Sequence, residues 1–190
     1  MFPLMNTISP EIKAQLSRDE KVLWAGQPKQ GVILRGSDAF MVPFSLMWGG
    51  FAIFWELSVL QTDAPAFFAL FGIPFVLIGL YLIVGRFFFE AKQRANTFYG
   101  VTGERVIIVS GVFSRKVKSL NLRTLSDLSL SEGKGSEGTV SFGGGSPFSS
   151  MFAGFAGWPG IEQYLGPRFE LIPNAKSVFE TIRGAQRAAA

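Results

Sequence analysis

The sequence of 190 residues contains no cysteine and no histidine. Without cysteine, the chain cannot form disulfides, thiolate metal sites or a cysteine nucleophile. Without histidine, it lacks the commonest metal ligand and the usual general base of enzymes. We therefore expect a non-catalytic protein that has no metal site and no cofactor.

Charge is also scarce in the middle third of the chain. Residues 40–60 contain one ionisable side chain, Glu56, and residues 66–89 contain only Arg86. A hydrocarbon core about 30 Å thick is crossed by about 20 apolar helical residues, and both segments reach this length. We predict transmembrane helices at 40–60 and 66–89, joined by an external turn at 61–65. The alternative, two buried helices of a soluble protein, is rare in so short a chain.

Basic residues flank this pair of helices, whereas the turn at 61–65 has no lysine or arginine. Cytoplasmic loops of membrane proteins carry the excess of basic residues. We therefore expect both termini in the cytoplasm and the protein in the inner (cytoplasmic) membrane. The flanking residues are Lys13, Arg18, Lys21, Lys29 and Arg35 before the first helix, and Arg86, Lys92 and Arg94 after the second.

Small residues line one face of each predicted helix. Ser45, Gly49 and Ala52 recur at helical spacing in the first, and Gly72 and Gly79 do so in the second. Because small residues let membrane helices approach closely, we predict that these two faces meet. The alternative is that glycine is simply frequent in membrane helices.

The two charges of the pair, Glu56 and Arg86, lie near opposite ends and are too far apart to bind each other. We expect Glu56 to reach water at the outer surface and Arg86 to extend to the cytoplasmic headgroups. A single acid without a partner argues against a transporter. A pore built from two helices per chain would require a large oligomer.

Short apolar runs with glycine-rich breaks follow from residue 96 and are typical of antiparallel strands. We expect residues 96–190 to form a mainly β cytoplasmic domain, and residues 1–39 to add a helix at about 10–18 and a strand around Trp24. The predicted strands are 98–102, 105–110, 115–122 (with a bulge near Ser119), 125–131, 139–142 and 168–172. A terminal helix follows, with an apolar stripe of Ala175, Val178, Phe179, Ile182 and Ala185.

Four sequence fragments resemble the bacterial pleckstrin-homology-like (PH-like) membrane proteins. They are DEKVLWAGQP (19–28), YGVTGERVIIVSG (99–111), GTVSFG (138–143) and FELIP (169–173). The resemblance implies a two-helix membrane hairpin plus a PH-like roll, an α+β or mainly β fold with antiparallel strands and one C-terminal helix. It also implies a membrane location and an adaptor or assembly role, and it does not imply a reaction.

Five basic residues gather between positions 105 and 123 with no acidic residue among them: Arg105, Arg115, Lys116, Lys118 and Arg123. One interpretation is contact with anionic lipid headgroups, worth about 1 kcal/mol per basic residue near the surface. The other is a solvated strand face whose charges protect a sheet edge. The net charge of +4 is modest, so we expect no nucleic-acid partner.

Residues 143–167 form a glycine- and aromatic-rich insert that is too apolar for a solvated linker. Three placements are open: in the membrane interface, over the sheet, or against another subunit. We expect a protein partner or a homo-oligomer to use this insert. Protein interaction or self-assembly is therefore the first functional hypothesis, and anionic-lipid binding is the second. The candidate contact residues of the insert are Phe148, Phe152, Phe155 and Trp158.

Overall fold

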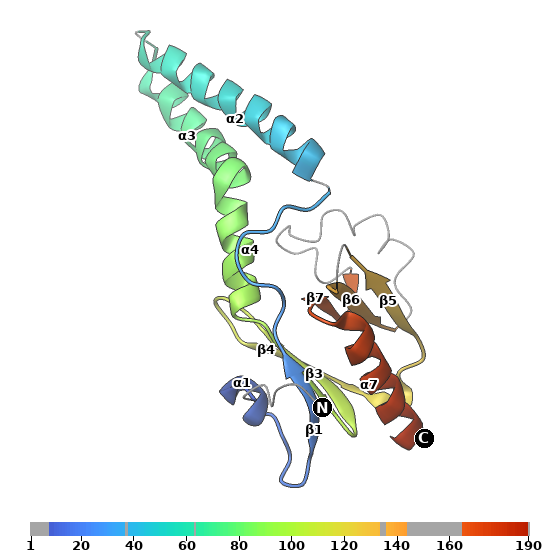
Figure 1. The fold of residues 1–190 in the computed structure, drawn as a ribbon. Helices are drawn as coiled ribbons and strands as arrows, with labels where there is room; N and C mark the ends of the chain where they lie inside the picture. Colours follow the sequence, from blue (N-terminus) through green and yellow to red (C-terminus); the bar gives the residue numbers. More distant parts are fainter. Residues whose placement is uncertain (1–7, 37, 63, 134–135, 144–164, 190) are drawn as a thin grey trace. The chain divides into compact units, whose positions relative to one another are not determined.

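The computed structural model describes residues 8–36, 38–62, 64–133, 136–143 and 165–189. The chain divides into two compact units. The helical unit is Val32–Glu90, and the β unit combines Met1–Gly31 with Ala91–Ala190. Figure 1 shows the elements of both units along the chain.

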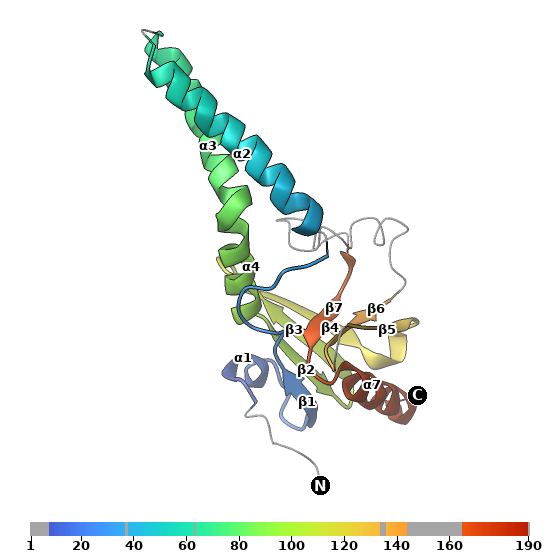
Figure 2. The same cartoon turned by 45° about the horizontal axis from the view of Figure 1, so that its top comes forward.

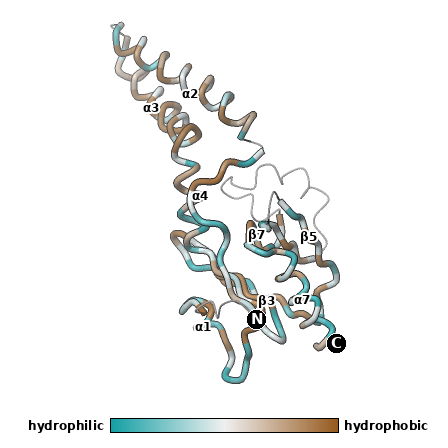
Figure 3. Tube along the Cα trace, in the orientation of Figure 1, coloured by the Kyte–Doolittle hydropathy of each residue, from teal (hydrophilic) through white to brown (hydrophobic). Residues whose placement is uncertain are grey.

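The helical unit contains α2 (Asp38–Leu60) and α3 (Ala66–Leu80). After α3 the helix continues through a π-helical segment, η1 (Tyr81–Gly85), into α4 (Arg86–Ala95). By length and composition, α2 and the continuous helix 66–95 are each able to cross a membrane. Figure 3 shows hydrophobic residues along most of α2 and α3.

The small residues of the helical pair are its buried residues, as the sequence predicted. Besides Asp38 and Met41, the buried positions of α2 are Ser45, Gly49 and Ala52, and those of α3 are Gly72 and Gly79. A methyl group added at Gly79 would lie 2.9 Å from the Cα of Gly49. The two backbones are therefore in direct contact, which only glycine at both positions permits.

The first sheet of the β unit has four antiparallel strands in the order β1-β2-β3-β4. They are β1 (Val22–Gly26), β2 (Phe98–Thr102), β3 (Arg105–Ser110) and β4 (Lys116–Asn121). The strand expected around Trp24 is thus the edge strand β1, which pairs with β2. The whole helical pair lies in sequence between these two hydrogen-bonded neighbours.

The second sheet contains β5 (Leu128–Glu132), β6 (Gly138–Phe142) and β7 (Arg168–Ile172), and helix α7 (Ala175–Ala189) follows it. One hydrophobic core joins the two sheets and α7 (Figure 2). At its centre Phe169 contacts Tyr99, Phe142 and Trp24, with ring centroids 4.5, 4.9 and 5.5 Å away. This is the predicted architecture of antiparallel strands followed by one C-terminal helix. The apolar stripe of α7 faces this core, with Phe179 only partly buried.

The predicted helix at 10–18 is shorter than expected. Helix α1 covers only Pro10–Lys13 and buries Ile12 against Ile107 and Val109, on the face of the first sheet opposite the main core. The chain leaves the helix because the carbonyl of Gln15 accepts a hydrogen bond from Arg105 instead. A tertiary contact therefore overrides the local helix signal.

The bulge predicted near Ser119 is wrong. Strands β3 and β4 pair without interruption from Arg105↔Asn121 to Ser110↔Lys116. No phase change is needed, because Leu120 packs on the main core from the same face as Lys118. Leu122 lies beyond the strand, in the 3-10 turn η2 (Leu122–Thr124), and β5 begins only at Leu128 rather than at 125.

We predict that Gly49→Leu separates α2 from α3, because a side chain at this position meets Ile83 and the backbone of Gly79. Overpacking of this kind typically costs about 1–3 kcal/mol. The measurement is the fraction of detergent-solubilised protein that stays monodisperse after heating. Gly50→Leu is the matched control, since a side chain at Gly50 would project into open space. Equal losses in the two variants would contradict the close approach at Gly49.

Candidate functional site

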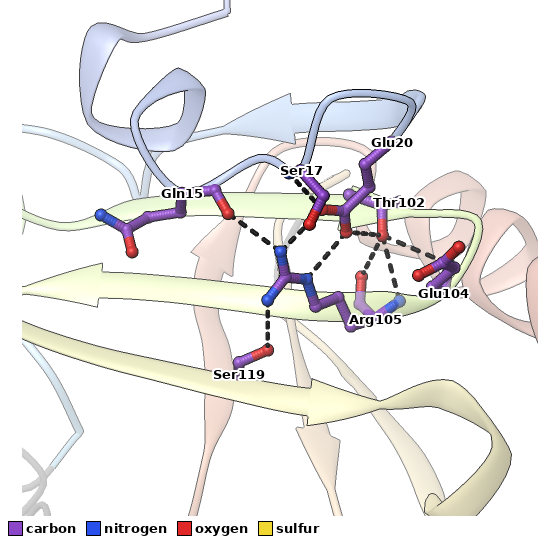
Figure 4. Close-up of polar contacts among 7 residues, drawn as sticks. All are labelled: Gln15, Ser17, Glu20, Thr102, Glu104, Arg105 and Ser119. Atoms are coloured by element: carbon purple, nitrogen blue, oxygen red, sulfur yellow. Dashed lines mark hydrogen bonds and ion pairs between the residues drawn. The ribbon is translucent and has the colours of Figure 1, made fainter.

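Arg105, at the start of β3, holds the segment that precedes the helical pair (Figure 4). Its Nε donates to Glu20 Oε1 at 2.8 Å, and its Nη2 donates to Glu20 Oε2 at 2.6 Å. The same Nη2 donates to the carbonyl of Gln15 at 2.9 Å. The side chain of Glu20 is only 3% exposed. This is the two-pronged arginine–carboxylate geometry, the strongest form of such a pair.

Thr102 joins this arrangement from the end of β2. Its Oγ1 lies 2.8 Å from Glu20 Oε1 and accepts hydrogen bonds from the backbone N–H groups of Glu104 and Arg105, at 3.2 and 3.0 Å. The backbone N–H of Ser17 donates to the other carboxylate oxygen of Glu20. The contacts in Figure 4 therefore join the β2–β3 turn to the segment before β1.

The electrostatics of this pair are those of a structural contact. The hydrogen bond from Arg105 lowers the pKa of Glu20 from 4.5 to about 2. The same bond raises the pKa of Arg105 above its ordinary value. Each charge is thus compensated by the other, and the guanidinium is committed to Glu20 rather than to a ligand.

The five basic residues predicted as one surface fall at two ends of the first sheet. Arg105 pairs with Asn121 at one end, where Arg123 follows in η2 and is exposed. Lys116 pairs with Ser110 at the other end. The structure therefore separates Arg105 and Arg123 from the remaining three residues, which are Arg115, Lys116 and Lys118.

These three residues belong to the β3–β4 connection and the first part of β4, residues 111–118, which we call the basic turn. All side chains from Phe113 to Lys118 are exposed, and that of Phe113 is 90% exposed. The turn depends on Gly111, which has φ +137°, and a side chain there would collide with the carbonyl oxygen of Ser114. Phe113 was not identified from the sequence, although a lone aromatic residue in a short glycine- and serine-containing turn was a usable signal.

The basic turn lies at the end of the sheet from which the chain leaves for the helices and to which it returns. At this end Gly26, the last residue of β1, pairs with Tyr99. Phe98, three residues after α4 ends at Ala95, pairs with Val109, and β3 then enters the turn after Ser110. Strand register thus brings the basic turn to the level of both junctions.

A second charged cluster lies within the helical unit. Arg86 Nη2 lies 2.7 Å from Asp38 Oδ1, and both side chains are 7% exposed. The other oxygen of Asp38 accepts from the backbone N–H of Arg35, whose guanidinium lies 3.6 Å from Glu90. The expectation that Arg86 extends freely to headgroups is therefore wrong. Its partner is Asp38, the first residue of α2, two residues before the transmembrane helix predicted at 40–60.

Glu56 also differs from its expected place at the water surface. Its Oε2 is buried, and a methyl group at Gly72 would collide with it. No hydrogen-bond partner of this oxygen occurs within the described part of the chain. The carboxyl group therefore lies between α2 and α3, in space that exists because residue 72 has no side chain.

The aromatic insert residues Phe148, Phe152, Phe155 and Trp158 lie outside the described residues. The ends of the insert are visible in the pairing of the flanking strands. Val140 pairs with Phe169, and the N–H of Phe142 donates to the carbonyl of Pro167. The insert therefore connects two adjacent antiparallel strands.

Comparison with known protein families gives a match over most of the chain. Residues 51–183, more than two thirds of the chain, match the family described as Bacterial PH domain. The match begins inside α2 and ends inside α7, so β1 and the Glu20 side of the ion pair lie before it. No curated protein and no solved structure matches the chain.

We predict that Glu20→Gln destabilises the protein at neutral pH and flattens its response to acid. Because the pKa of Glu20 is depressed from 4.5 to about 2, its carboxylate gives stability that is complete above pH 4.5 and is lost as the pH falls toward 2. The shift corresponds to stability on the order of 3 kcal/mol. Urea unfolding across this pH range, followed by tryptophan fluorescence, measures it. Glu180→Gln, at an exposed position of α7, is the control, and parallel acid profiles for Glu20→Gln and the unmodified protein would disprove the role of Glu20.

Proposed function

The chain belongs to the bacterial PH domain family, and from this premise we propose that it is an integral membrane protein with a binding role rather than a catalytic one. It presents its PH-like domain at the cytoplasmic face of the inner membrane, for protein interaction or self-assembly. The observation that carries this proposal is the position of an apolar helical pair between two neighbouring strands, β1 and β2, of the same sheet.

Exposure of the helices supports the membrane part of the proposal. In the most apolar stretch of each helix, only 22% and 11% of residues are buried. The core helix of a soluble protein would be mostly buried. Large apolar side chains cover the outside of both helices, among them Phe51, Phe54, Phe67, Leu70 and Leu77. Such a surface matches the hydrocarbon of a bilayer, in which exposed apolar side chains carry no penalty.

The pairing of β1 with β2 is a second argument for two membrane crossings, because it requires both strands to be on the same side of the membrane. Ala25 pairs with Gly100 and Gly26 pairs with Tyr99, so the chain leaves and returns to the β unit at neighbouring positions. The two strands must therefore lie on one side of the membrane. The basic residues flanking the pair favour the cytoplasmic side.

The insert supports protein interaction. Two adjacent antiparallel strands are commonly joined by two to five residues, whereas β6 and β7 are joined by residues 143–167. The length and the aromatic content of this connection exceed what the sheet requires. A surface that contacts another chain explains both properties.

We predict that a cysteine at Gln61 reacts with a membrane-impermeant maleimide on intact cells, because the turn lies outside. A cysteine at Ser126, in the β unit, should react only after lysis. The natural chain has no cysteine, so each variant carries a single thiol. Equal labelling of the two positions on intact cells would contradict the proposed topology.

We also predict that replacing residues 145–163 by a short glycine linker leaves the β unit folded and reduces the mass of the complex extracted in mild detergent. The sheet should survive because the β6–β7 pairing lies outside the deletion. Light scattering coupled to size-exclusion chromatography measures the mass. The milder comparison variant changes Phe148, Phe152, Phe155 and Trp158 to serine and keeps the loop length. A complex of unchanged mass in both variants would rule out the insert as the assembly surface.

A further inference from the structure

We propose that the basic turn docks on the anionic headgroup surface of the membrane that holds the helical pair. Phe113 enters the interface between headgroups and acyl chains, and Arg115, Lys116 and Lys118 contact lipid phosphates. This inference rests on the proposed membrane insertion of α2 and α3. It narrows the predicted basic cluster to three of its five residues and adds an aromatic residue.

The first argument is position. Only residues 90–95 of helix α4 follow the apolar segment 66–89, a distance of about 9 Å. Strand β2 begins three residues after α4, and its first residue, Phe98, pairs with Val109, two residues before Gly111. With strands about 4.8 Å apart and about 3.4 Å per residue along a strand, the turn begins roughly 10 Å from Phe98. The membrane surface is thus within reach of the turn.

The second argument is chemistry. A phenylalanine side chain that is 90% exposed at the tip of a turn is costly in water and favourable at the boundary between headgroups and acyl chains, where surface-binding segments bury Trp, Phe and Leu. Val117, which also belongs to the basic turn, is a second exposed apolar side chain. Each basic residue held near an anionic surface strengthens association about fivefold. The chain has no acidic residue between Glu104 and Asp127, so no local carboxylate offsets the attraction.

The third argument is that the other two basic residues, Arg105 and Arg123, are placed away from the basic turn. The guanidinium of Arg105 binds Glu20 and the carbonyl of Gln15. Arg123 follows β4 at the end of the sheet away from the junctions with α4. Neither residue belongs to the docking surface, and their substitution should not alter lipid contact.

The test uses the full-length protein in nanodiscs of phosphatidylcholine, with or without phosphatidylglycerol. A fluorophore on a cysteine at Ser114 reports accessibility to the neutral aqueous quencher acrylamide. We expect phosphatidylglycerol to shield this label, and high salt to remove the shielding. Combined Arg115→Gln, Lys116→Gln and Lys118→Gln should weaken the docking equilibrium on the order of 100-fold, and Phe113→Ser should weaken it further.

Two controls make the result specific. A label on a cysteine at Gly103, in the β2–β3 turn at the opposite end of the sheet, should be equally accessible in both lipids. Combined Lys176→Gln, Arg183→Gln and Arg187→Gln removes the same charge from exposed positions of α7 and should leave the shielding intact.

Equal accessibility of the label at Ser114 in both lipids would overturn the proposal. Shielding that occurs only when a second protein is added would overturn it in favour of a protein-docking turn. Incorporation into nanodiscs tests the membrane insertion itself, because a protein without transmembrane helices would not be incorporated. The quenching measurement then tests the docking of the basic turn alone.

Discussion

The hydrogen-bonded ladder between β1 and β2 is the interaction on which the rest of the structure depends. It joins residues 22–26 to residues 99–102 across the whole helical pair. Two side-chain contacts reinforce it on the far side of the sheet: Ile12 packs over Gly100, where a methyl group would lie 3.0 Å from its Cγ2, and Glu20 binds Arg105. Trp24 then extends β1 into the main core through Phe169. The segment before the helices is therefore an integral part of the domain.

The two ion pairs, Glu20–Arg105 and Asp38–Arg86, stabilise buried charges in the same way. Burial of a charged group is costly unless a partner and further hydrogen bonds replace water. Glu20 receives these bonds from Arg105, Thr102 and the backbone of Ser17. In the helical unit, Arg86 receives its compensation from Asp38. Glu20, which precedes the helices, binds Arg105, which follows them. Asp38, the first residue of α2, binds Arg86, which follows the turn at 61–65.

Sequence patterns predicted most of the elements because their signals are local. Helical spacing of small residues identified the buried faces at Gly49 and Gly79, and the apolar stripe identified the buried face of α7. The ion pairs could not be predicted in the same way, because Glu20 and Arg105 are brought together only by the register of strands far apart in sequence. The helix expected at 10–18 failed for the same reason, since its last turn is replaced by contacts with Arg105.

The candidate basic surface shows the same limit. Five basic residues close in sequence suggested one patch, but a hairpin places residues near its turn and residues near its open end far from each other. The register of β3 and β4 therefore decides which charges act together. The sequence context of Phe113 marks it as unusual, but its exposure, which no sequence periodicity encodes, is what makes it a candidate contact residue.

The insertion of the helical pair between β1 and β2 has a consequence for biosynthesis. In the proposed topology, β1 has no partner strand until both helices have been made and the chain has returned to the side of the membrane that holds residues 22–26. A chain that crossed the bilayer only once would leave β1 and β2 on opposite sides, with Trp24, Ile12 and Glu20 separated from their partners. In the proposed topology, completion of the β domain would report correct membrane insertion, and wrongly inserted chains would present an unpaired strand edge to the cell's proteases.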